Sequence, residues 1–180
     1  MTHEIETKVL NIDKNEIIKK IVSAGGKKTG ETRLSVDWYR LTGTKEDKDP
    51  WFLRIRSNSE GKHEVTWKAK SETVGIARKH KEINLLIQES EKLTAIFEEI
   101  GLEKYAHQEK DRTSLTLKNC LLEIDQYPDM PAFLEIEGPN EESIKEIINL
   151  LSLEKNKTWQ KGERILIQEI YGLDWYQMNF

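Results

Sequence analysis

Charged residues occupy alternate positions in one predicted strand after another along this chain. Successive side chains of a strand point to opposite faces of its sheet, so residues two apart share a face. Leu53 and Ile55 therefore face one way, while Arg54 and Arg56 face the other. The same spacing recurs around Glu4 and in five later segments. A fold for this chain must accommodate a charged face on several strands at once.

These charged positions separate by sign, with acidic pairs and basic pairs on different strands. The simplest interpretation is a sheet whose outer face is solvated, although such faces usually mix hydroxyl, amide and charged groups of both signs. The alternative is that they line the wet interior of a closed barrel, where opposite charges make burial tolerable. The acidic positions are Glu4, Glu6, Glu82, Glu123, Asp125, Glu135 and Glu137, and the basic ones are Lys8, Arg54, Arg56, Lys68, Lys70, Lys110 and Arg112.

A barrel of this kind predicts a definite ligand chemistry. Paired carboxylates offer the oxygen ligands that hard divalent cations such as Mg²⁺ or Mn²⁺ prefer. Arginine binds phosphate oxygens through its fork of donors, and lysine binds them as a point charge. Acids on some strands and bases on others would together bind a metal ion and a polyphosphate.

The order of elements supports a barrel. Strand, helix and several strands form one β-α-β-β-β unit that is used twice, and short turns between strands favour antiparallel pairing. We therefore predict an α+β fold in one domain spanning 1–180. The predicted extended segments cover 3–10, 27–41, 51–57, 62–70, 76–87, 103–118, 121–127 and 132–137, and the predicted helices begin near 14, 90, 140 and 159, the last covering 159–171.

Composition excludes several classes of protein. No apolar run approaches the roughly 18 residues of a membrane span, and the acidic start argues against a signal peptide. One cysteine, Cys120, allows no disulfide framework, so we expect a reducing, cytoplasmic compartment. A formal net charge of −4 does not indicate a duplex nucleic-acid binder.

The segment Glu4-Ile5-Glu6-Thr7-Lys8 resembles the E-x-E-x-K signature of the CYTH domain. This is the family of triphosphate tunnel metalloenzymes, with class IV adenylyl cyclases, thiamine triphosphatases, inorganic triphosphatases and fungal-type RNA 5′-triphosphatases among its members. The resemblance covers about 2–170 and leaves an aromatic tail, 171–180, which we expect to pack on the barrel wall. Other segments that resemble the family, in family order, are 37–39, 53–56, 66–68, 110–112 and 133–137.

The resemblance implies a closed eight-stranded antiparallel tunnel with helices packed outside. It also implies that Glu4 and Glu6, together with Glu135 and Glu137, ligate Mg²⁺ or Mn²⁺. Asp125 matches an acidic position near the reacting phosphorus. Glu137 and Asp125 are the candidates for a base, and Lys8 is the third candidate catalytic residue. The implied triphosphate ligands are Lys8, Arg54, Arg56, Lys68, Lys110 and Arg112, whereas Lys70, Glu82 and Glu123 depend mainly on the alternation.

Three functions remain open at this stage. We favour hydrolysis of a triphosphate, with cyclisation of ATP to cyclic AMP and pyrophosphate as the alternative. Class IV cyclases tend to carry an aromatic-glycine lead-in and an L-G-x-F segment, where this chain has 1–3 and 130–133. A non-catalytic module that binds polyphosphate or RNA ends is the third possibility. The expected partner is a small-molecule triphosphate, and the chain is expected to be a monomer or a homodimer.

Overall fold

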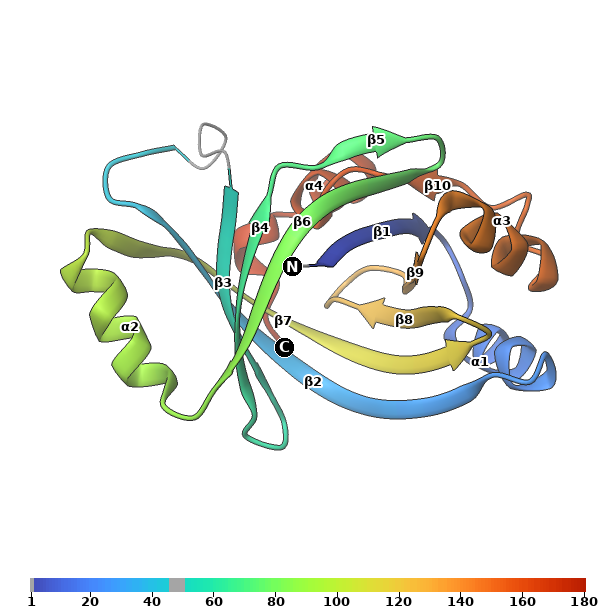
Figure 1. The fold of residues 1–180 in the computed structure, drawn as a ribbon, viewed down its shortest axis with the longest axis horizontal. Coiled ribbons are helices and arrows are strands. Elements are labelled where there is room, and N and C mark those ends of the chain that lie inside the picture. The colour runs from blue at the N-terminus through green and yellow to red at the C-terminus, as the bar shows by residue number, and fades with distance from the viewer. Residues whose placement is uncertain (1, 46–50) are drawn as a thin grey trace.

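A closed barrel dominates the computed structural model, which describes residues 2–45 and 51–180. Within these residues, eight antiparallel strands pair in the order β1-β9-β8-β7-β2-β3-β4-β6, and pairing of β1 with β6 closes the ring (Figure 1). The predicted barrel is confirmed. Its strands are β1 (Thr2–Val9), β2 (Lys27–Leu41), β3 (Trp51–Asn58), β4 (His63–Ala69), β6 (Ala77–Ile87), β7 (Leu102–Leu117), β8 (Cys120–Gln126) and β9 (Phe133–Gly138).

The helices lie outside the barrel. The segments β1-α1-β2-β3-β4 and β6-α2-β7-β8-β9 reproduce the predicted unit twice. The helix α2 lies at one end of the molecule, and α1 and α3 lie at the other (Figure 1). The helices are α1 (Lys14–Ser23), α2 (Ser90–Glu99), α3 (Glu141–Leu150), α4 (Glu163–Tyr171) and the short 3₁₀ helix η1 (Trp175–Gln177).

At two helix starts the residue before the helix caps it with its side chain. Asp13 accepts a hydrogen bond from the Glu16 amide at 2.8 Å, and Asn140 accepts one from the Ser143 amide at 2.8 Å. Each such cap satisfies an amide that the helix itself leaves without a partner.

The predicted start of the last helix is wrong. Thr158 and Trp159 form a short strand, β10 (Thr158–Trp159), which pairs with Val9 and Lys8 at the edge of β1. Pairing with a distant strand overrides the helical pattern there, and α4 begins only after Gly162. A second short strand, β5 (Glu72–Val74), pairs with β6, and both short strands lie outside the ring of eight.

Apolar side chains on the outer face of the barrel form the core. Ile17 in α1 and Ile147 in α3 share one buried cluster with Leu122 and Ile136 of β8 and β9, each no more than 2% exposed. Burial of this kind contributes about 25 cal/mol per Å². Because the helices cover the outside, the charged residues of the same strands must face inward.

The aromatic tail packs on the barrel, as expected. The Glu109 amide of β7 donates a hydrogen bond to the Met178 carbonyl at 2.8 Å, and Trp175 is 3% exposed. Together with α4, the tail encloses a second apolar cluster that includes Tyr127 and Phe133.

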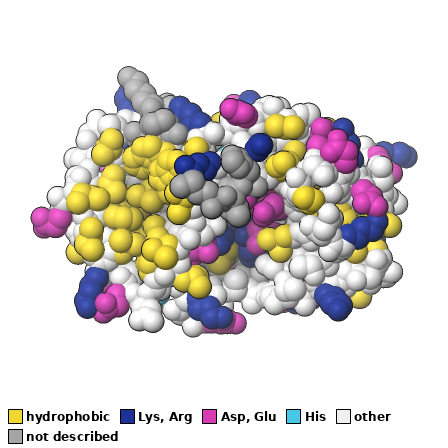
Figure 2. Space-filling model, viewed as in Figure 1, with side chains coloured by type: hydrophobic (Ala, Val, Ile, Leu, Met, Phe, Trp, Pro, Cys, Tyr) yellow, Lys and Arg dark blue, Asp and Glu magenta, His cyan; other side chains and the backbone are white. Residues whose placement is uncertain are grey.

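Apolar side chains also gather at the end of the molecule that carries α2 (Figure 2). Exposed residues on that part of the chain include Ile96 and Ile100 of α2 and Leu85 of β6. Across the described residues, no helix has the length and apolar character needed to cross a bilayer.

Candidate active site

The inward-facing charges surround one cavity of about 260 Å³ inside the barrel. Most of the predicted site residues line it. The lining residues that the sequence predicted are Glu4, Glu6, Arg54, Arg56, Lys68, Glu82, Arg112, Glu123, Glu135 and Glu137. The alternation in the sequence therefore identifies the inner face of the barrel correctly.

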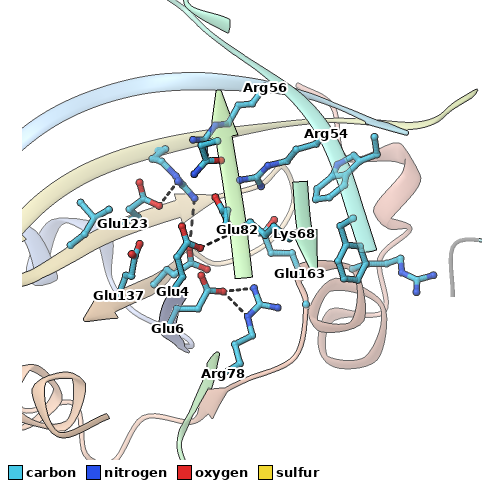
Figure 3. Close-up of a pocket in the computed structure, with 18 of the residues that line it drawn as sticks. Glu4, Glu6, Arg54, Arg56, Lys68, Arg78, Glu82, Glu123, Glu137 and Glu163 are labelled. Atoms are coloured by element: carbon cyan, nitrogen blue, oxygen red, sulfur yellow. Dashed lines mark hydrogen bonds and ion pairs between the residues drawn. The ribbon is translucent and has the colours of Figure 1, made fainter. Parts of the chain in front are cut away.

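Carboxylates gather on one side of this cavity. Glu6 of β1 lies opposite Glu137 of β9, and Glu135 lies opposite Glu123 of β8. Glu4, Glu6, Glu123 and Glu137 lie together in Figure 3, while Arg54 and Arg56 reach in from another side. The cavity therefore has an acidic wall and a basic wall.

Glu6 is held by two cations. The Arg78 Nε donates to the Glu6 Oε1 at 2.6 Å, a second guanidinium nitrogen donates to the same oxygen, and the Lys8 Nζ lies 3.3 Å away. Burial alone would raise the pKa of Glu6, but Arg78 and Lys8 hold it well below its usual range. Arg78 lines the cavity and was missed from the sequence, although it shares a face of β6 with His80 and Glu82.

A second set of contacts surrounds Glu4. Its Oε2 lies 3.1 Å from the Lys68 Nζ and 3.0 Å from the His80 Nε2, and Lys68 also pairs with Glu82. Burial opposes ionisation of Glu82, but His80 and Lys68 lower its pKa. His80 was not among the predicted ligands, because the sequence spacing of the histidines carries no metal-site signal.

Three predicted residues lie behind the cavity wall. Lys8, Lys110 and Asp125 are each no more than 1% exposed and do not line the cavity. Asp125 accepts hydrogen bonds from the Arg112 Nε at 2.6 Å and from the Lys110 Nζ at 2.7 Å. Asp125, itself paired with Lys110, thus holds the Arg112 side chain in place, and Arg112 lines the cavity.

Glu163 is a further residue that sequence reasoning missed. It lines the cavity from the first turn of α4, and its Oε1 accepts a hydrogen bond from the Lys110 Nζ at 2.7 Å. Burial would raise the pKa of Glu163, but Lys110 and Lys8 lower it. Lys70, in contrast, lies one residue beyond the end of β4, is exposed and does not line the cavity.

Arg54 and Arg56 differ in how they are paired. The Arg56 Nη2 donates to the Glu64 Oε1 at 2.7 Å. Arg54 forms no ion pair with any residue of 2–45 or 51–180, its Nε has no hydrogen-bond partner there, and its guanidinium lies 5.6 Å from the centre of the Trp38 ring. Arg54 is therefore a cation inside the barrel that forms no direct ion pair with a carboxylate of the described residues.

Comparison with protein-family models finds a match to the CYTH domain over residues 2–163. The chain belongs to the CYTH family. No match to a curated protein was found by sequence. The family match spans the whole barrel and nearly the whole chain, which confirms the resemblance that the sequence suggested.

Solved structures share the CYTH fold of this chain. The PH1012 protein from Pyrococcus horikoshii OT3 is 22% identical with a TM-score of 0.71, covering 86% of this chain and 94% of that one. A candidate adenylate cyclase from Vibrio parahaemolyticus is 12% identical with a TM-score of 0.77, covering 93% and 98%. The candidate adenylyl cyclase HpAC1 from Hippeastrum, described as having a dominant triphosphatase activity, is 12% identical with a TM-score of 0.70, covering 94% and 96%.

CYTH proteins depend on a metal ion, and the acidic wall of this barrel fits one. Ligand atoms of Glu4, Glu6 and His80 lie within 4.8 Å of one another. Glu137 forms no ion pair within the described chain, and burial together with Glu4 and Glu6 raises its pKa to about 7. Carboxylates that repel one another in this way offer the oxygen ligands that suit a hard divalent cation, and His80 adds a nitrogen beside them.

Proposed function

We propose that this chain hydrolyses a triphosphate substrate in a reaction that depends on a divalent metal ion. The observation that carries the proposal is a single cavity with an acidic wall and a basic wall. A triphosphate with its metal ion needs both walls at once. The triphosphatase activity named for HpAC1, which shares this fold, supports the choice of hydrolysis.

The basic wall would bind the phosphates of the substrate, and the acidic wall would bind the metal ion. Phosphoryl transfer needs little covalent chemistry from the protein, so positioning and charge stabilisation supply most of the catalysis. A bound Mg²⁺ or Mn²⁺ supplies positive charge to the phosphate oxygens as negative charge develops on them. We assign the phosphate oxygens to Arg54, Arg56, Lys68 and Arg112, with Arg78 beside them, and the metal ion to Glu4, Glu6, Glu135 and Glu137.

Glu137 is the candidate for the base. It faces the cavity without a cation of its own among the described residues, so the carboxylate oxygen that does not bind the metal ion would be available to accept a proton from the attacking water. Asp125, Lys8 and Lys110 are buried behind the wall, and we assign them to positioning: they fix Arg112, Glu6 and Glu135 by ion pairs. No covalent nucleophile is needed.

A second candidate function uses the same cavity. In an adenylyl cyclase the ribose 3′-hydroxyl attacks the α-phosphorus and expels pyrophosphate, and both reactions require the triphosphate to be held. The fold shared with a candidate adenylate cyclase from Vibrio parahaemolyticus favours keeping this alternative in the test. A non-catalytic module is less favoured, because all four carboxylates assigned to the metal line the cavity.

The test is incubation of the purified protein with inorganic triphosphate, ATP and thiamine triphosphate in turn, with Mg²⁺ and then with Mn²⁺. Release of orthophosphate, abolished in Glu137→Gln, is the expected result. Cyclic AMP and pyrophosphate from ATP would establish the cyclase instead. Binding of a triphosphate without any product would establish the non-catalytic module.

A further inference from the structure

An apolar face lies on the outside of the barrel, beside α2. Glu82 and Asn84 of β6 line the cavity, so the alternate residues Ile83 and Leu85 face outward. Ile83 is 45% exposed and Leu85 is 61% exposed, so nothing in the described chain covers the sheet at these positions. Contiguous apolar surface of this kind marks a site of interaction with another protein.

The apolar face continues over three neighbouring strands. Ile83 pairs with Trp67 of β4, and Trp67 pairs in turn with Leu53 of β3. Leu85 pairs with Val65 of β4 in the next row. Trp67, Leu53 and Val65 are all partly exposed. The outer faces of β3, β4 and β6 thus form one surface, within the gathering of apolar side chains that Figure 2 shows at this end.

The helix α2 forms a ridge beside this face. Its Phe97 is buried against Tyr39 of β2, with the two ring centres 5.0 Å apart. Ile96 and Ile100 lie one turn apart on the helix and are 55% and 64% exposed. The same end of the molecule therefore carries an apolar ridge and an apolar sheet face.

A ridge and a face on the same molecule are complementary under a two-fold rotation. The rotation that lays α2 of one copy on β4 and β6 of a second copy also lays the second α2 on the first sheet. Such an interface is isologous, so each contact occurs twice and the assembly closes as a dimer.

The charges around the two surfaces are opposite in sign. The helix α2 (Ser90–Glu99) contains three glutamates and one lysine. The outward positions of β6 that precede Ile83 are Lys79 and Lys81, and the Lys81 Nζ lies 5.8 Å from the centre of the Trp67 ring. Because α2 runs back alongside β6, its last residue, Glu99, lies at the Lys81 end of the face (Figure 1). An acidic helix would therefore lie on a sheet with a basic border.

The size of the apolar surface also matches a dimer interface. An interface of standard size buries about 800 Å² on each partner, of which somewhat more than half is non-polar. At their exposures, Ile83, Leu85, Ile96 and Ile100 present on the order of 400 Å² of apolar surface. These four side chains supply most of the non-polar centre that such an interface needs.

We propose that a second copy of this chain covers this face, with α2 of each copy packed on β4 and β6 of the other. The inference does not depend on the proposed function, because these side chains lie outside the barrel. Ile96 and Ile100 pack on Ile83 and Leu85 at the centre, and charged residues of α2 and β6 meet at the rim.

Sedimentation velocity at protein concentrations up to roughly 100 μM tests the dimer, since interfaces of this size bind with micromolar affinity or better. The expected mass is twice the 21.1 kDa of the chain. Leu85→Arg should weaken dimerisation at least roughly 100-fold, because it places a charge at the centre of the interface twice. Leu150→Arg is the matched control and should leave the dimer intact, because Leu150 is 44% exposed on α3 at the other end of the molecule. Thermal unfolding shows whether each variant folds, and Ile96→Arg replaces Leu85→Arg if that variant does not.

A charge exchange tests how the two copies are arranged. Lys81→Glu and Glu99→Lys should each weaken dimerisation roughly three- to tenfold, and the two substitutions together should restore it. A wild-type protein that stays monomeric at roughly 100 μM would overturn the proposal, as would a dimer that survives Leu85→Arg and Ile96→Arg. A double variant that dimerises no better than either single variant would overturn the placement of α2 on β6.

Discussion

For a single residue, the presence or absence of an ion pair within the protein decides what its loss should change, and Arg54 is the clearest case. It has no carboxylate partner among the described residues, whereas Arg56 pairs with Glu64 at 2.7 Å. Arg54→Ala should therefore weaken the binding of inorganic triphosphate at least roughly tenfold, since a hydrogen bond to a charged group contributes about 1.5–3 kcal/mol. The melting temperature without ligand should not fall, because no ion pair within the protein is lost. Titration calorimetry and thermal unfolding give the two values.

The matched control for Arg54→Ala is Arg33→Ala. Arg33 pairs with Asp111 at 2.8 Å on the outside of the barrel, and its side chain is 46% exposed. Its loss should leave the affinity for triphosphate unchanged. An Arg54→Ala protein that binds as tightly as the wild type would remove Arg54 from the phosphate site.

Glu4 gives the corresponding prediction for the metal ion. Glu4→Gln keeps the size of the side chain but removes the charge that a divalent cation needs, so we expect activity to fall on the order of 100-fold. Binding of Mn²⁺, followed by its electron paramagnetic resonance signal, should weaken in parallel. Glu103→Gln is the control, because Glu103 pairs with Arg40 away from the cavity. Full Mn²⁺ affinity in Glu4→Gln would contradict the assignment.

At the scale of one strand, neighbouring residues of β9 should give opposite results. Ile136 is fully buried in the outer core, and Ile136→Ala should lower the free energy of unfolding by about 2–5 kcal/mol. Glu137→Gln on the inner face removes one of several carboxylates that repel one another, so metal-free stability should not fall. Urea unfolding in EDTA measures both. A stable Ile136→Ala protein would contradict the assignment of faces.

The strands of the barrel were predictable because side chains that face inward and outward alternate in each of them with a period of two. The two residues of β10 were not, because Thr158 and Trp159 form a strand only by pairing with Lys8 and Val9, about 150 positions earlier in the chain. The same pairing explains why the last helix begins at Glu163 rather than near 159. A local sequence pattern predicts a strand or helix wherever the segment is long enough for its periodicity to repeat.

For the whole molecule, alternation predicts which way a side chain faces but not how deeply it lies. Lys110 and Asp125 face inward as expected, yet they are buried behind the cavity wall. Arg78 was predictable from the same face of β6 as Glu82. Glu163 was not, because its place depends on how α4 packs against the barrel, and a single acidic residue in a first helical turn carries no signal of that packing.

The buried charges of the barrel also make its stability depend on pH. Glu163 accepts hydrogen bonds from Lys110 and from the Tyr127 hydroxyl, and its pKa is lowered from the ordinary value of 4.5. A carboxyl group whose pKa is lower in the folded state binds protons more readily when unfolded. The stability that it contributes is therefore present above about pH 4.5 and is lost as the pH falls toward its lowered pKa.

Glu163→Gln tests this contribution because glutamine can still accept the Tyr127 hydrogen bond but carries no charge. At pH 7 the variant should be less stable by about 1–3 kcal/mol, since Lys110 loses one of its two carboxylate partners. The difference should shrink as the pH is lowered below the ordinary carboxyl range, because the wild-type carboxylate is then progressively protonated as well. Urea unfolding at a series of pH values measures this difference directly. A difference that stayed constant down to the acid limit would mean that the effect of Glu163 is one of packing rather than charge, and the ion pairs inside the barrel would then not be the source of its acid sensitivity.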